Sequence, residues 1–452
     1  MAQRPNLELR NAISRAGLSG DALARRVNTI GAEAGLRLAY GRASVSQWLS
    51  GARPRPPVPE LVAEALARRI GRHLTPADIG WPAPEGTRGS AAWWEADPLD
   101  LIADLYHRES SGGTTAHPVY NMAALDVPMW APSVHRSPYR PHHPVRIGQT
   151  EAASATAMLH LAIQADDAFG GGAMRSPLVG YLATMVGPWL RSRANGEVRR
   201  RLLTSGARLS CLTGFMYFDD GLHGAAQRYY RIALRLTAES GDTAGHSVTL
   251  RAMSSQACAL GHPRAALHLA QAGVTALSEV SAPCTRALLL GQLAVVHARN
   301  GEQQQATHLL AAAEHMLRRT TGPRCRDNGY YTASLAHQRA DIAASSGDRS
   351  AAVTSLAECL RHLPEAKRRY RALCLARLAE LKLDSGCLDG AAADWHRFLD
   401  DYPALRSGRA RAALSRLRAR LRPFARSSTT RDLLHRAVTV SEAAAHFPAS
   451  RR

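Results

Sequence analysis

The sequence predicts an all-α protein in which a small helical bundle precedes a solenoid of helical hairpins. Alanine and leucine are abundant, and aromatic residues make up only 6% of the 452 residues. That balance favours helix over sheet. Apolar residues recur at helical spacing over residues 1–80, which is the main sequence signal for amphipathic helices. Glycine–alanine pairs then recur roughly every 40 residues in the second half, which indicates stacked repeats.

Composition divides the chain into five predicted segments. Residues 1–80 form a helical domain, and residues 81–148 are rich in Pro, Gly, His and Ser. We expect the latter to be a linker with one helix near Pro98–His107. Residues 149–205 are a helical lead-in, residues 206–404 hold the repeats, and residues 405–452 form a basic capping helix and tail. The arginines of this last segment are expected to form a solvated basic face or, alternatively, to add contacts with phosphate.

The first segment carries four helical patterns followed by a short turn. Ser19 is a plausible N-cap for the second helix, and Gly35 a plausible stop after it. Three prolines stand at the start of the fourth helix, where their missing N–H groups do little harm. The first predicted helix spans Leu7–Ala16, and the second carries Leu23, Val27, Ile30 and Ala34 on one face. The third spans Ala43–Ser50 and the fourth Val58–Ile70. The short turn at Thr75–Asp78 follows the fourth helix.

The short third helix has one apolar side and one polar side. At 100° per residue, Val45, Trp48 and Leu49 fall on one side and Ala43, Gln47 and Ser50 on the other. A major groove admits a helix whose outward side chains are short or form hydrogen bonds. Gln47 can pair with the edge of adenine, and Arg42 with guanine or a phosphate. Arg53 and Arg55 follow the helix in a proline-containing loop that can contact the DNA backbone.

The run from Ser44 to Gly51, Ser-Val-Ser-Gln-Trp-Leu-Ser-Gly, resembles the recognition helix of phage-repressor-type (XRE) regulators. It is most similar to the actinobacterial subgroup found in Streptomyces, the NsdA-like regulators of development and antibiotic production. The segments Ala24–Asn28, Pro59–Leu66 and His73–Gly80 are similar to the same subgroup. The resemblance implies DNA contacts from the start and outer face of the third helix and from the loop after it, at Arg42, Ala43, Ser44, Ser46, Gln47, Arg53 and Arg55.

One departure from that pattern concerns the connection between the second and third helices. Leu23 and Val45 are 22 residues apart, about 11 more than a compact repressor allows. Eleven residues are almost a whole number of turns at 3.6 residues per turn. The second helix is therefore expected to lengthen, and residues 35–41 to form a longer loop. The alternative is a helical bundle without any DNA contact, with Trp48 in its core under either interpretation.

The repeats are marked by a glycine with an alanine five positions later. The pairs are spaced by 40, 40, 46 and 39 residues and are Gly221/Ala226, Gly261/Ala266, Gly301/Ala306, Gly347/Ala352 and Gly386/Ala391. Such a period predicts a solenoid in which each hairpin packs on the next. The pattern resembles the tetratricopeptide (TPR) repeat, although the units are longer than usual. The segments Asp166–Arg175, Tyr181–Leu182 and Val186–Leu190 resemble the lead-in of the same Streptomyces regulators, with Gly170–Gly172 as a flexible turn.

A TPR-like solenoid presents the first helix of each pair on its concave face. We expect basic and amide side chains there to bind a peptide or small molecule with an acidic group, because arginine binds carboxylates well. The alternative is that these residues only repeat the arginine bias of the whole chain, where 55 of 57 basic residues are arginine. The candidate residues are Arg208, Arg251, Gln256, Gln292, His297, His337, Gln338, Arg371 and Arg377.

No enzyme motif appears, so no catalytic residue, cofactor or metal site is predicted. The seven cysteines include no C-x-x-C pair, which favours free thiols over a disulfide framework or a zinc site. His142–His143 stands among prolines without a supporting cluster of ligands. Asp166–Asp167 and Asp219–Asp220 are expected to be solvated helix ends. The N-terminus lacks the apolar core of a signal peptide, so a cytoplasmic protein is expected.

The net charge of +20 and a pI near 10.5 are typical of phosphate-binding proteins. Together with the resemblances, they predict a cytoplasmic transcriptional regulator of development or secondary metabolism that binds double-stranded promoter DNA. The solenoid is expected to bind a peptide, small molecule or protein, and to form a homodimer through residues 149–452. The alternative is a TPR-type adaptor that binds proteins without specific DNA binding.

Overall fold

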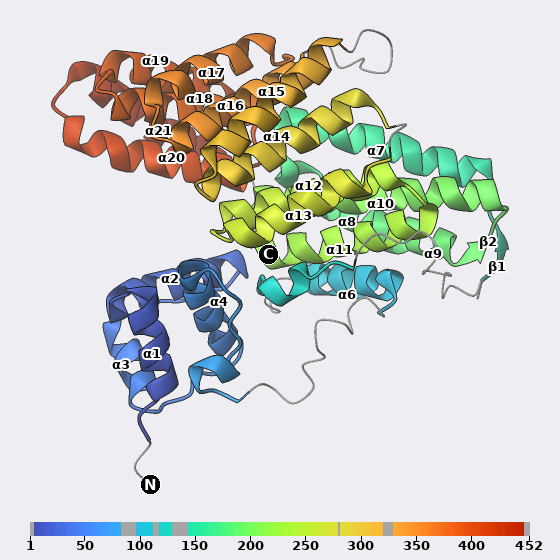
Figure 1. The fold of residues 1–452 in the computed structure, drawn as a ribbon, viewed down its shortest axis with the longest axis horizontal. Helices are drawn as coiled ribbons and strands as arrows, with labels where there is room; N and C mark the ends of the chain where they lie inside the picture. The colour runs from blue at the N-terminus through green and yellow to red at the C-terminus, as the bar shows by residue number, and fades with distance from the viewer. Residues whose placement is uncertain are drawn as a thin grey trace.

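The computed structural model describes residues 4–82, 96–111, 117–128, 143–278, 281–319 and 329–446. Within these ranges the chain is helical, apart from one short parallel strand pair, β1 (His143–Arg146) with β2 (Ser192–Arg193). The predicted all-α class is therefore confirmed. A small N-terminal bundle lies beside a large solenoid of TPR-like helical hairpins (Figure 1).

The N-terminal bundle has the helices that the sequence predicts. Their ends follow local chemistry: the Asn6 and Ser19 side chains cap α1 and α2, and Gly35 after α2 adopts a positive φ of 76°. Apolar faces meet in a core that extends to Trp81. The elements are α1 (Leu7–Ala16), α2 (Gly20–Glu33), α3 (Arg42–Leu49), α4 (Val58–Ile70) and the 3₁₀ turn η1 (Ala77–Ile79).

Part of the predicted linker packs into the core of the solenoid. Leu99, Ile102 and Leu105 of α6 (Pro98–Ser110) are buried there, as are Tyr120 and Leu125. The linker also contains the short turn η2 (Met122–Leu125). The lead-in follows the linker and packs on the first hairpin. Its elements are α7 (Gln149–Phe169), η3 (Gly171–Ala173), α8 (Arg175–Tyr181), the π-helical turn η4 (Leu182–Val186) and α9 (Gly187–Leu190).

Five helical hairpins follow, and the glycine–alanine pairs explain their geometry. Each predicted glycine ends the first helix of its hairpin with φ between 78° and 86°, a left-handed conformation that favours glycine. Each paired alanine is fully buried, where a small side chain lets two helices approach closely. The hairpins are α10 (Gly196–Asp219) with α11 (His223–Ser240), α12 (Thr243–Ala259) with α13 (Pro263–Ala276), α14 (Pro283–Arg299) with α15 (Gln303–Arg319), α16 (Tyr330–Ser345) with α17 (Arg349–His362), and α18 (Arg368–Asp384) with α19 (Leu388–Asp401).

The C-terminal segment covers the last hairpin around the buried Trp395 and Phe398. Several of its arginines are exposed, among them Arg411, Arg416 and Arg418, and some of them pair with acidic residues of the solenoid. Arg409 and Arg416 bind Asp219 and Glu380 at 2.9 and 2.8 Å, so the predicted basic face is partly neutralised by acidic residues of the solenoid. The elements are η6 (Tyr402–Ala404), α20 (Gly408–Leu421), η7 (Arg422–Phe424) and α21 (Ser428–His446).

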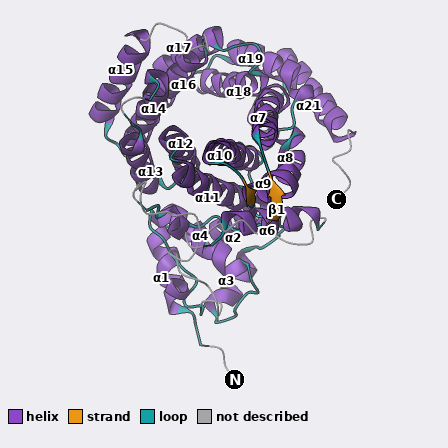
Figure 2. Cartoon of the chain, turned by 90° about the vertical axis from the view of Figure 1, so that its right-hand side faces the viewer, coloured by secondary structure: helices purple, strands orange, loops and turns teal. Residues whose placement is uncertain are grey.

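The solenoid turns back on itself, so that its last hairpin meets the lead-in (Figure 2). The Arg369 guanidinium in α18 lies 2.9 Å from the Asp166 carboxylate in α7 and 3.6 Å from that of Asp219 in α10. Arg409 in α20 also binds Asp219. Asp166 and Asp219 are 3% and 0% exposed, so the prediction that these aspartates are solvated helix ends is wrong. They form a buried ion cluster that closes the ring.

The glycine turn between α7 and α8 belongs to the same closure. The Gly172 N–H donates to the carbonyl oxygen of Arg406 at 2.8 Å, and the Arg406 N–H donates to Phe169 at 2.6 Å. A Cβ atom on Gly170 would stand 2.8 Å from that Arg406 oxygen, and Gly170 has a φ of 85°. The predicted flexible turn is therefore a tightly packed contact between the lead-in and the C-terminal segment.

A buried polar network docks the N-terminal bundle on the solenoid. Arg68 in α4 binds Glu33 through two hydrogen bonds of 2.7 and 2.6 Å, and Glu64 through one of 2.8 Å. His262, at the turn between α12 and α13, lies 3.0 Å from the same Glu64 carboxylate. The Tyr120 ring stacks on His262 with centroids 5.8 Å apart. The contact fixes α2 and α4 against the solenoid (Figure 1).

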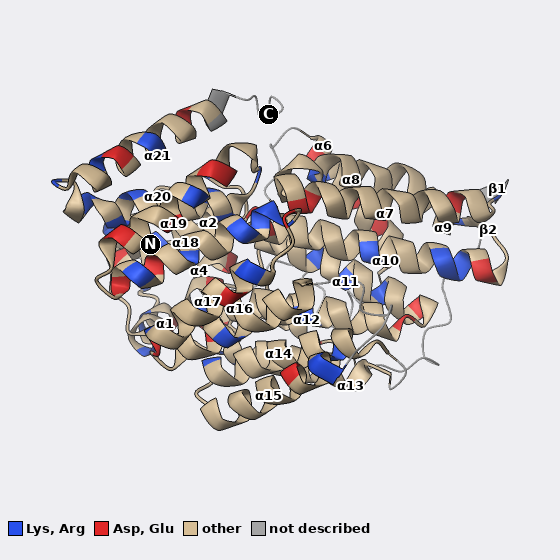
Figure 3. Ribbon diagram, turned by 90° about the horizontal axis from the view of Figure 1, so that it is seen from above, with Lys and Arg blue, Asp and Glu red and all other residues tan. Residues whose placement is uncertain are grey.

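The distribution of charge and the state of the cysteines are also visible in the structure. Basic and acidic residues both occur on many of the helices that are seen from above the molecule (Figure 3). Cys284 is disulfide-bonded, so the prediction of free thiols is wrong at that position. Cys211, Cys258, Cys359, Cys374 and Cys387 are free. Among the described residues, no helix is both long and apolar enough to span a membrane.

Acidification is expected to destabilise the fold through His246, which is 4% exposed in α12. Burial lowers the pKa of His246 to about 4. The pKa of histidine in the unfolded chain is near 6.5. Between pH 6.5 and pH 4, His246 is therefore protonated in the unfolded chain and neutral in the folded chain, so stability falls as the pH falls. From pH 7 to pH 5 this group should remove about 2 kcal/mol. Urea unfolding of wild type and His246→Gln at both pH values measures the difference.

A matched control for that comparison is His308→Gln, because His308 is exposed on α15. It should leave the loss of stability between pH 7 and pH 5 unchanged. Equal pH dependence in wild type and His246→Gln would contradict the expectation.

Candidate nucleic-acid interface

The long connection between α2 and α3 is ordered by side chains of α2. Asn28 forms two hydrogen bonds with the backbone of Tyr40, both at 2.9 Å. The side-chain amide nitrogen of Asn28 donates to the carbonyl oxygen of Tyr40, and the Tyr40 N–H donates to the side-chain oxygen of Asn28. Leu38 lies over Gly31, where a Cβ atom would stand only 2.4 Å from the leucine methyl group. Residues 34–41, between α2 and α3, thus form a loop that packs against α2. The orientation of α3 is fixed in this way.

The inner face of α3 fits between α2 and the end of the bundle. Val45 and Trp48 are 1% and 4% exposed. The Trp48 ring makes edge contacts with Tyr40 and Trp81, with centroids 5.2 and 6.2 Å apart. The Asn6 N–H donates to the carbonyl oxygen of Leu49 at 2.9 Å, which attaches the end of α3 to the start of α1. The predicted buried side of the helix is therefore confirmed.

The opposite face of α3 is open to solvent. Arg42, Ala43, Ser46 and Gln47 are exposed, and Ser44 is half-buried at the edge. A shallow depression on this face is lined by Ala43, Ser46, Gln47, Ser50 and Ala52. All of these side chains are small or form hydrogen bonds, as a helix in a major groove requires. In the bundle, α3 lies farther from the solenoid than α2 and α4 do (Figures 1 and 2), and the exposed residues of this face remain accessible to solvent.

Arginines flank this face without acidic neighbours in the sequence. Residues 34–59 contain four arginines and no aspartate or glutamate. Arg55 is exposed after α3, whereas Arg53 donates to the carbonyl oxygen of Pro82 at 2.8 Å. Arg53 therefore also attaches the loop to the end of the bundle. A stretch with one sign of charge beside a polar helix face is suited to bind phosphates.

Several residues that shape this site were not identified from the sequence. Tyr40, Leu38 and Trp81 help to hold the loop and α3 in position, yet they stand outside the resembling segments. Asn28 ends one of those segments, but its hydrogen bonds to the loop were not predicted. Their signal was weak because the loop itself has no regular period. The apolar residues among the charged and small ones of residues 36–40 are the hint that this loop is packed.

The predicted ligand-binding residues of the solenoid differ in how far they are exposed. Gln256 is 0% exposed, and its amide nitrogen donates to the carbonyl oxygen of His223 at 2.9 Å. Gln292 is 6% exposed, and its amide oxygen accepts from the Ser255 hydroxyl at 2.9 Å. Both glutamines therefore connect helices and do not line an open surface. Arg208 is exposed 3.6 Å from Asp242, and Arg377 is 43% exposed 3.5 Å from Glu380. The Nε atom of Arg251 is buried and has no hydrogen-bond partner among the described residues.

The remaining residues of that prediction also have partners. Gln338 is buried, with its amide nitrogen 3.5 Å from the carbonyl oxygen of Leu288. Arg371 binds Asp401 at 2.5 Å, and His297 binds Glu302. His337, the last of these residues, lies close to two cysteines.

Of the histidine pair among prolines, His142–His143, His142 lies outside the described residues.

Comparison with known protein families gives a match within the N-terminal part of the chain. A family model described as the SP15 N-terminal domain matches residues 9–82. A solved chain described as "Crystal structure of APC/C hetero-tetramer Cut9-Hcn1" is 16% identical, with a TM-score of 0.33, and the match covers 94% of this chain and 68% of that chain. No curated protein matches the chain.

Proposed function

We propose that the protein is a DNA-binding transcriptional regulator with a TPR-like domain for a signal or partner. The observation that carries the proposal is the outward face of α3, where Ala43, Ser46 and Gln47 are exposed on a helix held by two buried residues. In a helix-turn-helix protein this face enters the major groove. Gln47 would contact a base edge, Arg42 a guanine or phosphate, and Arg55 the DNA backbone.

The solenoid would supply the second activity of such a regulator. Helix-turn-helix proteins commonly bind paired half-sites as dimers, and we place the dimer contact in residues 149–452. A partner or peptide with an acidic group would bind the solenoid, with Arg251 as the proposed contact because its buried Nε atom has no partner among the described residues. Regulation of development or secondary metabolism, and a cytoplasmic location, belong to the same proposal.

Substitutions on α3 and after it should have different effects on DNA binding. Gln47→Ala removes a base contact and should lower discrimination at one base pair by about 1–3 kcal/mol. Arg55→Ala removes a phosphate contact, so it should weaken binding to all sequences and reduce the salt slope by about 1. Selection of binding sites from genomic DNA with the full chain, followed by titrations at several salt concentrations, measures both effects.

Arg361→Ala is a suitable control, because Arg361 is an exposed arginine on α17, in the solenoid. It should leave both the affinity and the salt slope unchanged. If the full chain shows no salt-dependent binding to any promoter DNA, the regulator proposal fails. The TPR-like repeats then favour the second candidate, an adaptor that binds proteins.

A further inference from the structure

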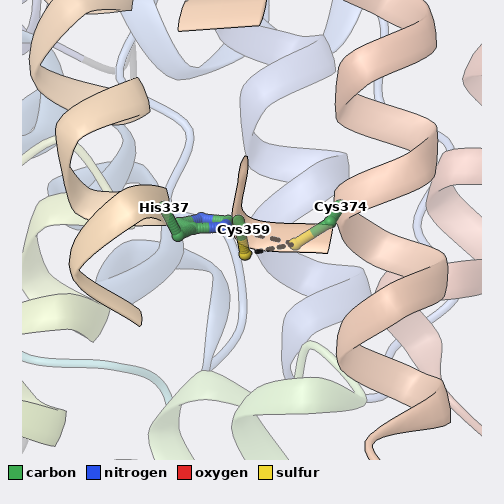
Figure 4. Close-up of side chains that lie close together, drawn as sticks. All are labelled: His337, Cys359 and Cys374. Atoms are coloured by element: carbon green, nitrogen blue, oxygen red, sulfur yellow. Dashed lines mark hydrogen bonds between the residues drawn. The ribbon is translucent and has the colours of Figure 1, made fainter. Parts of the chain in front are cut away.

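Three helices of the fourth and fifth hairpins bring a histidine and two cysteines together. His337 is on α16, Cys359 on α17 and Cys374 on α18, and their side chains point toward one another (Figure 4). The Nδ1 atom of His337 and the two Sγ atoms all lie within 4.8 Å of one another. Cys359 and Cys374 are fully buried, and His337 is partly exposed. The cluster therefore has an approach from solvent on the histidine side.

The spacing of these atoms fits the ligands of one tetrahedral metal ion. The two sulfur atoms are 3.8 Å apart, and Nδ1 of His337 is 3.3 Å from the sulfur of Cys374. In a tetrahedral zinc site with bonds of about 2.3 Å to sulfur and about 2.0–2.1 Å to nitrogen, the corresponding separations are about 3.8 and 3.6 Å. A small movement of His337 satisfies both distances. Among N and S ligands, this set suits zinc.

The second nitrogen of His337 has the partner that a metal-binding histidine usually has. Its Nε2 atom lies 3.7 Å from the carboxylate of Asp341, one turn further along α16, which is longer than a hydrogen bond. With Asp341 moved into hydrogen-bond range, its carboxylate would fix the tautomer that leaves Nδ1 free to bind a metal and would make that nitrogen more basic. The cluster thus has two metal-binding thiols, an imidazole oriented toward them, and an outer carboxylate.

The surroundings of the cluster are apolar on the side of the two sulfur atoms. Around the cluster lie the apolar side chains of Ala336, Leu356 and Leu378, which exclude water from the sulfur side.

We propose that His337, Cys359 and Cys374 form a binding site for a single zinc ion, with Asp341 as the outer partner of His337. Zinc binding displaces the thiol protons of Cys359 and Cys374 to solvent. The three protein ligands leave a fourth position, on the partly exposed side of His337, for water or another ligand. The ion would join hairpins four and five, which share one cluster of buried apolar residues. This site is independent of the DNA-binding proposal.

The test uses the full chain, made metal-free by chelation and kept reduced. One equivalent of Co²⁺ should give the absorption of a tetrahedral thiolate complex, and Zn²⁺ should displace it with the same stoichiometry. Cys359→Ser and Cys374→Ser should each abolish the thiolate band, and His337→Ala should weaken it. Asp341→Asn keeps all three ligands and should lower the affinity for Zn²⁺ about 10–100-fold.

Cys387→Ser is the matched control, since Cys387 is an exposed free cysteine just before α19. It should bind Co²⁺ and Zn²⁺ as the wild type does. Because the two buried substitutions alter the core, the melting temperature of each variant is measured with and without Zn²⁺. Wild type and Cys387→Ser should be stabilised by one equivalent of Zn²⁺, and His337→Ala much less. Absence of a thiolate band in the reduced wild type, or its loss in Cys387→Ser, overturns the proposal.

Discussion

Replacing Arg369 with alanine is expected to destabilise the protein by about 3–5 kcal/mol, because it leaves two buried carboxylates without their shared cation. Arg369 is 7% exposed and binds Asp166 at 2.9 Å, while Asp219 stands 3.6 Å away. Arg409 still reaches Asp219, but in the described contacts Asp166 has no other cationic partner. The loss should appear as a lower midpoint in urea and as a larger maximum dimension in X-ray scattering, since the ring opens between α7 and α18.

Arg377→Ala is the matched control on the same helix. Arg377 is 43% exposed and 3.5 Å from Glu380, and an exposed ion pair contributes at most about 1 kcal/mol. Asp166→Asn in the Arg369→Ala background removes the unpaired charge and should recover part of the lost stability. If Arg369→Ala unfolds at the same urea concentration as Arg377→Ala, the cluster does not hold the ring closed.

Arg68→Ala should have the second large effect, on the docking of the N-terminal bundle. Arg68 is the cation between Glu33 and Glu64, and Glu64 is only 5% exposed where it meets His262. Burial lowers the pKa of Arg68, but Glu33 and Glu64 raise it overall, so the arginine stays charged. Breaking a buried pair of this kind costs about 3–5 kcal/mol. Limited proteolysis should then cut between the bundle and the solenoid faster than in the wild type.

The control for docking is Arg72→Ala, two residues beyond the end of α4. Arg72 is exposed, so its removal should change stability by less than about 1 kcal/mol. His262→Ala removes only the solenoid side of the network, and its effect on proteolysis should have the same direction as that of Arg68→Ala. Unchanged proteolysis in both variants would show that the bundle is held by other contacts.

The local parts of the fold were predictable because they depend on neighbouring residues. Gly221 and Gly386 end helices through their own backbone conformation, and Ala226 and Ala391 let the paired helix approach. The outward face of α3 also follows from its own sequence, since Val45 and Trp48 fix which side is buried. These features need no knowledge of distant segments.

Contacts between distant segments were not predictable in the same way. Asp166 and Arg369 are 203 residues apart in sequence, so nothing near Asp166 indicates that it is buried. His337, Cys359 and Cys374 come from three helices and fit no short motif of metal ligands. His262 likewise meets Glu64 across 198 residues. The partners of Asp166 and Glu64 are selected by the path of the whole solenoid, whereas the cluster of His337, Cys359 and Cys374 depends on how three consecutive helices are rotated against one another.

The closed ring restricts how many hairpins this chain can have. An open solenoid can gain or lose a unit at its end, because each repeat contacts only its neighbours. Here Arg369 and Arg409 meet Asp166 and Asp219 only when the intervening units complete the turn. Duplication or deletion of one hairpin would separate these charges and the backbone contact between Arg406 and Gly172. In this chain, closure of the ring therefore depends on the number of hairpins as a whole.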